Sequence, residues 1–299
     1  MPDSAAENSY YARFSAARAP LRWPGGKPLA LAIVVSVEHY DLYAPPGSAV
    51  PAGLPGGFGR GPYPDVRAFS MRDYGARVGF SRILRSFMRH GVKGTLAADA
   101  YTASERPLIV KQALAAGWDL VGHGMSGTHI VSSLMDEDVE RSYIAQSLAP
   151  LQRLSARPLL GWHGPEYGQS ARSPRMLAEA GLCYTLDWPS DDRPIAMTVP
   201  DGSMLAIPML GDLDDVLAHW VRKISMERWL RTVMEAVEQL CAEGQASGSM
   251  LVVNIHPWLM GQPWRIGYLD RLLAWLVQRQ DVQLGGTDDI AQWFSQAGA

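Results

Sequence analysis

The sequence predicts an α/β fold, a single deformed (β/α) barrel of seven or eight strands that resembles a TIM barrel. Short apolar runs alternate with amphipathic helices along all 299 residues, and no break in composition divides the chain into halves. With 47% hydrophobic and 19% charged residues, the chain can bury a large core. We expect one domain over residues 1–299, with residues 1–21 as an N-terminal extension and residues 42–70 as a glycine- and proline-rich arm or lid.

The first half of the chain begins with the run LALAIVVSV at residues 29–37, which is typical of a strand buried on both faces of a parallel sheet. Gly91 is expected to end a helix over residues 74–90, and Pro150 to kink a helix over residues 136–155. The remaining elements expected in this half are strand 92–97, helix 107–116, strand 118–121 and strand 158–161.

The second half continues the same alternation. Ser173 as N-cap, Pro174 at the first helical position and Gly181 after the end are typical helix boundaries. After this helix we expect strands 182–185 and 204–209, helix 225–243, strand 250–255, helix 268–279, strand 282–284 and helix 288–294.

The charge balance and the cysteines limit the partners and the compartment. Thirty acidic and 27 basic residues give a net charge of −3, which predicts neither nucleic-acid binding nor attraction to an anionic membrane. The longest apolar run, residues 29–35, is far shorter than the roughly 20 residues that cross a bilayer. Cys183 and Cys241 lie far apart in the sequence, which favours a reducing cytoplasm. If the arm reaches a neighbouring subunit, the protein is a homo-oligomer.

Ionisable residues follow the carboxyl ends of several expected strands. They are Glu38, His39, Asp99, His123, His163, Asp187 and His256. In a (β/α) barrel these ends surround one mouth, so side chains far apart in the sequence are expected to converge there. The pattern predicts a catalytic site at this mouth.

Glu38 and His256 carry the clearest signals of proton chemistry. A carboxylate at the end of a buried strand must be paired or active in proton transfer, so Glu38 is either a base or half of a structural salt bridge with an arginine. His256 precedes Pro257, which turns the chain abruptly, and is either a general acid or base or a satisfied core histidine. His123 and His129 lie near glycines, and imidazoles commonly bind zinc and related ions.

Aromatic residues adjoin the same loops. Trp162, Tyr167 and Trp258 are candidates for stacking on a sugar or a planar ring, although core packing explains each of them equally well.

Five sequence features together resemble the polysaccharide deacetylase superfamily over about residues 22–294. The features are Tyr74-Gly75-x-Arg77-x-Gly79-x-x-Arg82-Ile83-Leu84, His123-Gly124, Gly161-Trp162, Tyr184-x-x-Asp187 with Asp191-Asp192-x-Pro194, and His256-Pro257-x-x-x-Gly261-x-Pro263-x-Arg265. This superfamily includes the nodulation-type deacetylases. The sequence is most similar to the branch that contains cofactor-free allantoinases and cyclic imide hydrolases.

The resemblance implies roles for individual residues. Glu38 matches the base and His256 the acid. For the hydrolysis itself we expect Asp187 or His163 to orient one of them. One divalent metal, such as zinc, is implied at His39, His123 and His129, with His39 in place of an aspartate and the other two six positions apart instead of four. The allantoinase-like branch tolerates loss of the metal, so a metal-free site is also open. The residues expected to bind substrate are Trp162, His163, Tyr167, Asp192, Trp258 and Arg265.

The expected function is hydrolysis of a non-peptide carbon–nitrogen bond in a small-molecule or sugar substrate. A bound metal lowers the pKa of water from 15.7 to about 7, which makes hydroxide roughly 12 kcal/mol easier to form. An N-acetyl sugar therefore favours a metal site, whereas a cyclic imide or ureide, such as allantoin, can be hydrolysed without one. A non-catalytic barrel that binds carbohydrate is the remaining alternative.

Overall fold

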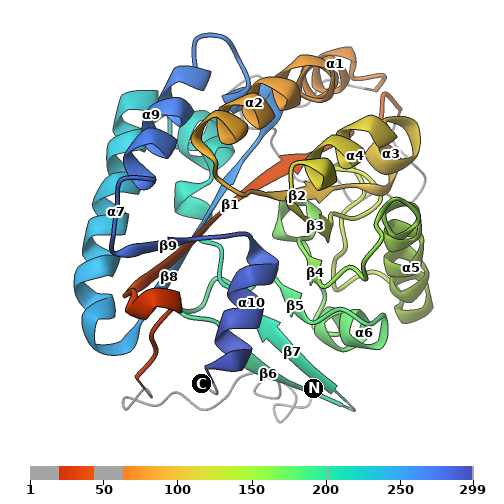
Figure 1. Ribbon diagram of the computed structural model, residues 1–299. Coiled ribbons are helices and arrows are strands. Elements are labelled where there is room, and N and C mark those ends of the chain that lie inside the picture. Colours follow the sequence, from red (N-terminus) through yellow and green to blue (C-terminus); the bar gives the residue numbers. More distant parts are fainter. Residues whose placement is uncertain (1–19, 44–62, 201, 298–299) are drawn as a thin grey trace.

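The computed structural model describes residues 20–43, 63–200 and 202–297, and a curled, mostly parallel sheet lies at its centre (Figure 1). The strand order is β6-β7-β5-β4-β3-β2-β1-β8, and β9 also pairs with β1. The strands are β1 (Leu29–Val37), β2 (Thr95–Ala98), β3 (Asp119–Gly122), β4 (Gly161–Trp162), β5 (Tyr184–Thr185), β6 (Ile195–Val199), β7 (Gly202–Ala206), β8 (Ser249–Ile255) and β9 (Val282–Leu284). Along this order β6 and β8 are the end strands and do not pair with each other, so the predicted deformed (β/α) barrel is confirmed in an open, half-barrel form.

Strand β1 is a central strand of the sheet and pairs with β2, β8 and β9. All nine of its residues are buried, as expected for an apolar run covered on both faces. It pairs in parallel with β8 from Leu29 opposite Ser249 to Val35 opposite Ile255, and its upper half pairs with β2. This register brings the residues that follow β1 and β8 to the same edge of the sheet.

Helices surround the sheet on the outside (Figure 1). They are α1 (Val66–Tyr74), α2 (Phe80–His90), α3 (Ala100–Glu105), α4 (Pro107–Ala115), α5 (Glu137–Leu154), α6 (Ser173–Glu179), α7 (Met226–Ser247), α8 (Pro257–Met260), α9 (Ile266–Leu276) and α10 (Thr287–Gln296). Three short helical segments complete the part of the fold that carries the site. Two are π-helical, η2 (Gly75–Gly79) and η5 (Leu217–Val221), and one is a 3-10 helix, η4 (Gly211–Leu213).

Several expected elements differ in the structure. Strand β6 and helices α1, α3 and α8 were not predicted, because each is short or lacks a clear apolar period. Strand β6 runs antiparallel to β7 as a hairpin, an exception to the predicted βα alternation. Helix α5 continues through Pro150 without a break, since Tyr143, Ile144 and Leu151 hold it on the core. Ser173 is the first residue of α6, and Arg172 is its N-cap.

The predicted extension and arm fall largely outside the described residues. Residues 1–19 and 44–62 are not described, whereas residues 66–70 belong to α1 and not to an arm. In the part of the chain that the structure describes, no helix has the length and apolar character needed to cross a membrane.

The turn after β8 is seated directly against η2. A Cβ atom at Gly79 would lie 2.1 Å from the Pro257 carbonyl oxygen, so only glycine allows the two backbones to approach this closely. Arg82 secures the contact by donating to the Gly261 carbonyl at 2.6 Å and to the Tyr74 hydroxyl at 2.7 Å. This contact fixes the direction in which the chain leaves β8.

Gly79→Ala is expected to destabilise the protein by about 1–3 kcal/mol, because the added methyl group overpacks a backbone contact that cannot give way. Urea unfolding followed by circular dichroism measures this change. Gly267→Ala is the matched control, since Gly267 is exposed in α9 with open space around it, and alanine there should stabilise by about 0.5–1 kcal/mol. Equal effects at the two glycines would contradict the close contact.

Candidate functional site

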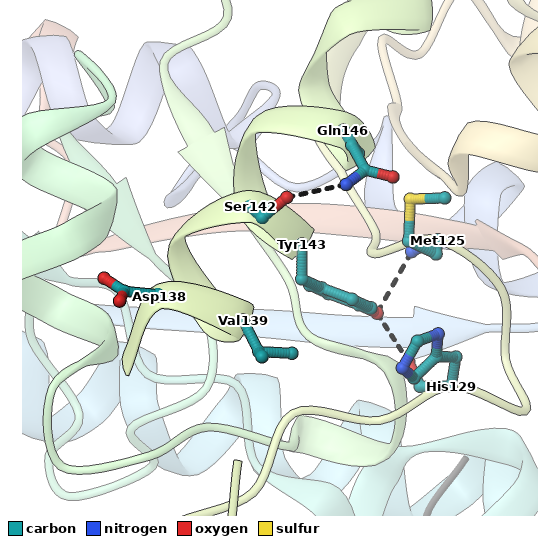
Figure 2. A pocket seen from close by; sticks show the side chains of 7 residues that line it. All are labelled: Met125, His129, Asp138, Val139, Ser142, Tyr143 and Gln146. Carbon is teal, nitrogen blue, oxygen red and sulfur yellow. Dashed lines mark hydrogen bonds between the residues drawn. The ribbon is translucent and has the colours of Figure 1, made fainter. Parts of the chain in front are cut away.

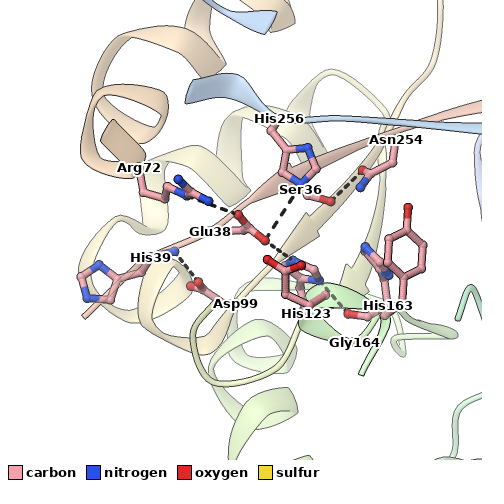
Figure 3. Close-up of polar contacts among 12 residues, drawn as sticks. Ser36, Glu38, His39, Arg72, Asp99, His123, His163, Gly164, Asn254 and His256 are labelled. Atoms are coloured by element: carbon pink, nitrogen blue, oxygen red, sulfur yellow. Dashed lines mark hydrogen bonds and ion pairs between the residues drawn. The ribbon is translucent and has the colours of Figure 1, made fainter. Parts of the chain in front are cut away.

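Glu38 is the centre of a buried charge cluster at the carboxyl ends of β1, β3 and β8. Its side chain is surrounded by three groups that can carry positive charge (Figure 3). His123 Nε2 lies 3.4 Å from Oε1, His256 Nε2 lies 4.0 Å from Oε1, and Arg72 Nε lies 3.8 Å from Oε2. Burial raises the pKa of Glu38, but the hydrogen bond from His123 and the charges of His256 and Arg72 outweigh it and lower the pKa to about 2. Glu38 is therefore a carboxylate at neutral pH.

His256 is held by Asp215 as well as by its position after β8. Its Nδ1–H donates to Asp215 Oδ1 at 2.8 Å, and its backbone N–H donates to both oxygens of the same carboxylate at 3.0 and 3.1 Å. Burial lowers the pKa of His256, but the carboxylates of Asp214, Asp215 and Glu38 raise it to about 10. The ring is therefore an imidazolium at neutral pH, with Nε2–H directed toward Glu38.

His123 is fixed in one tautomer by a backbone carbonyl. Its Nδ1 lies 2.7 Å from the His163 carbonyl oxygen, which can only accept, so Nδ1 carries the proton in the neutral ring. Nε2 can then donate to Glu38 only if His123 is charged. Burial lowers the pKa of His123, but the hydrogen bond and charge of Glu38 outweigh this and raise the pKa, which favours the charged ring.

His163 and Asp187 form a second anchored pair. His163 Nδ1–H donates to Asp187 Oδ1 at 2.8 Å, and the backbone N–H of Gly164 donates to the same carboxylate. Asp187 thus orients His163, whose ring stacks on His123 at a centroid distance of 4.6 Å.

A hydrogen-bond chain links β1 and β8 beneath the charged groups. The Ser36 hydroxyl donates to Asn254 Oδ1, and Asn254 Nδ2 donates to Asp214 Oδ2, both at 2.8 Å. The Tyr167 hydroxyl also donates to Asp214 Oδ2, at 3.2 Å. The network gives the buried amide a defined orientation, which keeps β1, β8 and the segment carrying Asp214 in register.

These groups line one cavity of about 160 Å³. Its lining comprises Glu38, Arg72, His163, Glu166, Tyr167, Asp214, Val216, Leu217, Asn254 and His256. Glu166 and Tyr167 have φ angles of 54° and 58°, a left-handed conformation that is costly for residues other than glycine. Such strain is typical of segments whose position serves a site.

Four of the residues expected to bind substrate do not line this cavity: Trp162, Asp192, Trp258 and Arg265. Trp258 lies next to the cavity, with its ring 4.0 Å from the Arg72 guanidinium carbon. Trp162 is buried in the core beside Gly122 and is not in the cavity lining. The Asp192 carbonyl accepts from Met250 N–H near the start of β8, at the opposite end of that strand from His256. Arg265 lies over Trp264, outside the cavity lining.

The structure does not bring the implied metal ligands His39, His123 and His129 together. His39 turns away from Glu38, with its ring stacked on Tyr101 at 3.5 Å and its Nε2 3.6 Å from Asp41 (Figure 3). The nitrogens of His123 face a carbonyl and Glu38, so the residues at these positions fit a paired charge and not a metal centre.

His129 lines a different cavity, of about 320 Å³, beside α5 (Figure 2). Its backbone carbonyl accepts from the Tyr143 hydroxyl, which also accepts from the Met125 backbone N–H. A short bridge between Ser126 and His129 closes this loop and holds His129 away from His39 and Glu38.

Asp214, Asp215 and His256 form the one group of three potential metal ligands found within the described residues, with ligand atoms less than 4.8 Å apart. Their atoms already have protein partners. Asp215 accepts from His256, and the two oxygens of Asp214 accept from Val216 N–H and Asn254. A metal would have to replace these bonds, so the geometry suits an anchored imidazolium better than an ion.

Sequence reasoning missed Arg72, Glu166, Asn254, Asp214 and Asp215. The two aspartates follow the strand expected at 204–209, so the rule that located Glu38 could have indicated them. Arg72 lies on a helix, and no post-strand signal marks it.

Comparisons with known proteins agree with this architecture, although no protein-family model matches the chain. A Schizosaccharomyces pombe protein named as a polysaccharide deacetylase is 25% identical over an alignment of 305 residues, which covers 91% of this chain and 92% of the relative. A solved structure named as a polysaccharide deacetylase from Pseudomonas aeruginosa PAO1 has a TM-score of 0.81 at 25% identity, over 92% of this chain and 93% of that one. The solved structure of Puue allantoinase also has a TM-score of 0.81 at 25% identity, over 93% of this chain and 94% of its own. The expected resemblance to the polysaccharide deacetylase superfamily, and within it to the branch that contains the allantoinases, is confirmed.

Proposed function

We propose that this protein hydrolyses a non-peptide carbon–nitrogen bond, with Glu38 as general base and His256 as general acid. The observation that carries the proposal is the pairing of an ionised carboxylate and a protonated imidazole on one cavity, with Oε1 and Nε2 4.0 Å apart. At neutral pH the base is free to accept a proton and the acid is ready to donate one.

The proposed reaction uses the fixed tautomers of the site. A water that hydrogen-bonds to Glu38 gives it a proton while attacking the substrate carbonyl carbon. His256 then transfers its Nε2 proton to the leaving nitrogen. The neutral ring that remains keeps its Nδ1 proton, because Asp215 accepts from that atom. Asp215 is thus a positioning residue that also stabilises the charged ring.

The low basicity of Glu38 favours an activated substrate. Complete transfer of a proton from water, pKa 15.7, to a carboxylate of pKa about 2 spans about 14 units, or roughly 19 kcal/mol. Free hydroxide is therefore not formed, and proton transfer must accompany attack on the carbonyl. A cyclic imide or ureide, whose ring nitrogen is a better leaving group than an ordinary amine, is better suited to this site than an unactivated acetamide.

The size of the cavity favours the same substrate class. A volume of about 160 Å³ is small beside the roughly 300–1,000 Å³ of pockets that hold drug-sized ligands. This space suits a small ring and not several sugar units. The similarity to Puue allantoinase supports a cyclic ureide, and the relatives named as polysaccharide deacetylases support an N-acetyl sugar as the second candidate.

Glu38→Gln is expected to lower kcat by at least 10²–10⁴, the usual contribution of a general base. The measurement is appearance of carboxylate from allantoin, hydantoin, dihydrouracil, succinimide and N-acetylglucosamine. Wild-type turnover of a cyclic compound supports the ureide proposal, and turnover of N-acetylglucosamine alone supports deacetylation. Tight binding without turnover of any of them would favour a carbohydrate-binding barrel, and a fully active Glu38→Gln variant would refute the role of the base.

Asp215→Asn is expected to move the alkaline limb of the pH profile of kcat/KM downward. Wild-type activity needs protonated His256, whose pKa is about 10, so it should be lost only as the pH rises through about 10. Removing a carboxylate that raises this pKa lets the proton dissociate at lower pH. Asp212→Asn is the control, because the Asp212 side chain is exposed and pairs with Arg222. A limb that stays near its wild-type position would show that Asp215 does not set the pKa of His256.

His39→Ala and removal of metals with EDTA are each expected to leave kcat unchanged, because His39 points away from Glu38. Turnover and metal content are measured on the same sample before and after dialysis. Loss of turnover that added zinc or cobalt restores would reinstate the metal site.

A further inference from the structure

Arg72 is an arginine buried inside the wall of the cavity. It comes from α1, and its side chain is only 4% exposed. The guanidinium carbon lies 3.9 Å from the centre of the Tyr40 ring and 4.0 Å from that of Trp258. Two aromatic faces therefore clamp the guanidinium plane, and both rings come from segments that directly follow Glu38 and His256.

The Nε–H group of Arg72 is not hydrogen-bonded to any described residue. Its Nε lies 3.8 Å from Glu38 Oε2, which is too far for a hydrogen bond, and this buried N–H has no hydrogen-bond partner among the described residues. Buried donors are nearly always paired, and an unpaired one is costly. A fixed donor at the edge of a cavity, beside the base, points to an acceptor that arrives with the substrate.

The charges of the site indicate when that acceptor appears. In the resting state Glu38 is the anion next to Arg72. When Glu38 takes a proton from water, its charge disappears, and a negative charge develops on the carbonyl oxygen under attack. The cation then faces the new anion at almost the same place, and the total charge of the cavity does not change.

We propose that Arg72 is a catalytic residue that donates to the carbonyl oxygen of the substrate and stabilises the oxyanion formed on attack by water. This inference rests on the proposed hydrolysis. An O–H bond of water breaks and its proton goes to Glu38, the water oxygen bonds to carbon, and the C=O electron pair moves to the oxygen that faces Arg72. As this pair returns, the C–N bond breaks and the nitrogen takes a proton from His256. Glu38 then returns its proton to His256, which restores the site.

The test compares Arg72→Met, Arg72→Lys and wild type on a substrate that the wild type turns over. Losing one oxyanion donor is expected to lower kcat by 10²–10³ with little change in KM. Lysine keeps the charge but not the planar fork, so it should recover part of the loss. Arg77→Met is the control, because Arg77 is exposed and pairs with Asp73 on the outer face of the same segment. An Arg72→Met variant with wild-type kcat would overturn the proposal and leave the hydrolysis intact.

A binding measurement separates this proposal from the proposed function. Methylphosphonate, a tetrahedral anion, is titrated into wild type, Arg72→Met and Arg72→Lys by calorimetry, after circular dichroism has shown which variants are folded. Binding that weakens at least tenfold in a folded Arg72 variant supports the anion-binding role even if the wild type hydrolyses none of the test compounds. Equal binding in wild type and a folded variant, or none in wild type, would overturn that role. If methionine prevents folding, the lysine variant decides the result.

Discussion

The pairing of the Glu38 carboxylate with positive charge is the constraint on which the rest of the site depends. A carboxylate taken out of water is costly unless opposite charges and hydrogen bonds compensate it, and breaking such a buried pair typically costs about 3–5 kcal/mol. The compensating groups come from three distant parts of the chain: His123 after β3, His256 after β8 and Arg72 on α1. The sheet must therefore curl until these ends meet. The Gly79 contact with Pro257 and the register of β1 with β8 both help to hold Glu38, His256 and Arg72 close together.

Three histidines at this edge follow the same rule of orientation. In each of them Nδ1–H is anchored: His123 to the His163 carbonyl, His163 to Asp187 and His256 to Asp215. The partners accept only, so every ring has a fixed tautomer and its Nε2 is the atom left for chemistry. The partners also separate the roles. The pKa of His256 is raised because the carboxylates of Asp214, Asp215 and Glu38 lie next to its ring. The pKa of His163 is lowered by burial and by the neighbouring charges of His123 and His256, despite the opposite effect of Asp187.

The sequence predicted the part of this site that obeys the geometry of parallel strands. Glu38, His123, His163, Asp187 and His256 each follow a strand, and parallel strands end at one edge. His39 was predicted to join them, but the structure turns it away, because successive residues of an extended chain point to opposite sides and the neighbour of an inward Glu38 points outward. His129 was misplaced because a local bridge turns its loop toward α5. Arg72 could not be found this way, since its position depends on how α1 packs against Tyr40 and Trp258, a tertiary contact without a sequence period.

The resting ion pair also explains how a weak base can serve this reaction. Glu38 is stable as an anion because His123, His256 and Arg72 surround it, and His256 is stable as a cation because Asp214, Asp215 and Glu38 lie next to its ring. In the proposed hydrolysis both lose their charge together, Glu38 by taking a proton from water and His256 by giving one to the leaving nitrogen. A substrate that displaces water from the cavity lowers the local dielectric constant, which disfavours the separated ions relative to the neutral groups. In the proposed reaction the cost of protonating Glu38 thus falls when the substrate binds, and Arg72 is already in place to stabilise the anion that forms on the carbonyl oxygen.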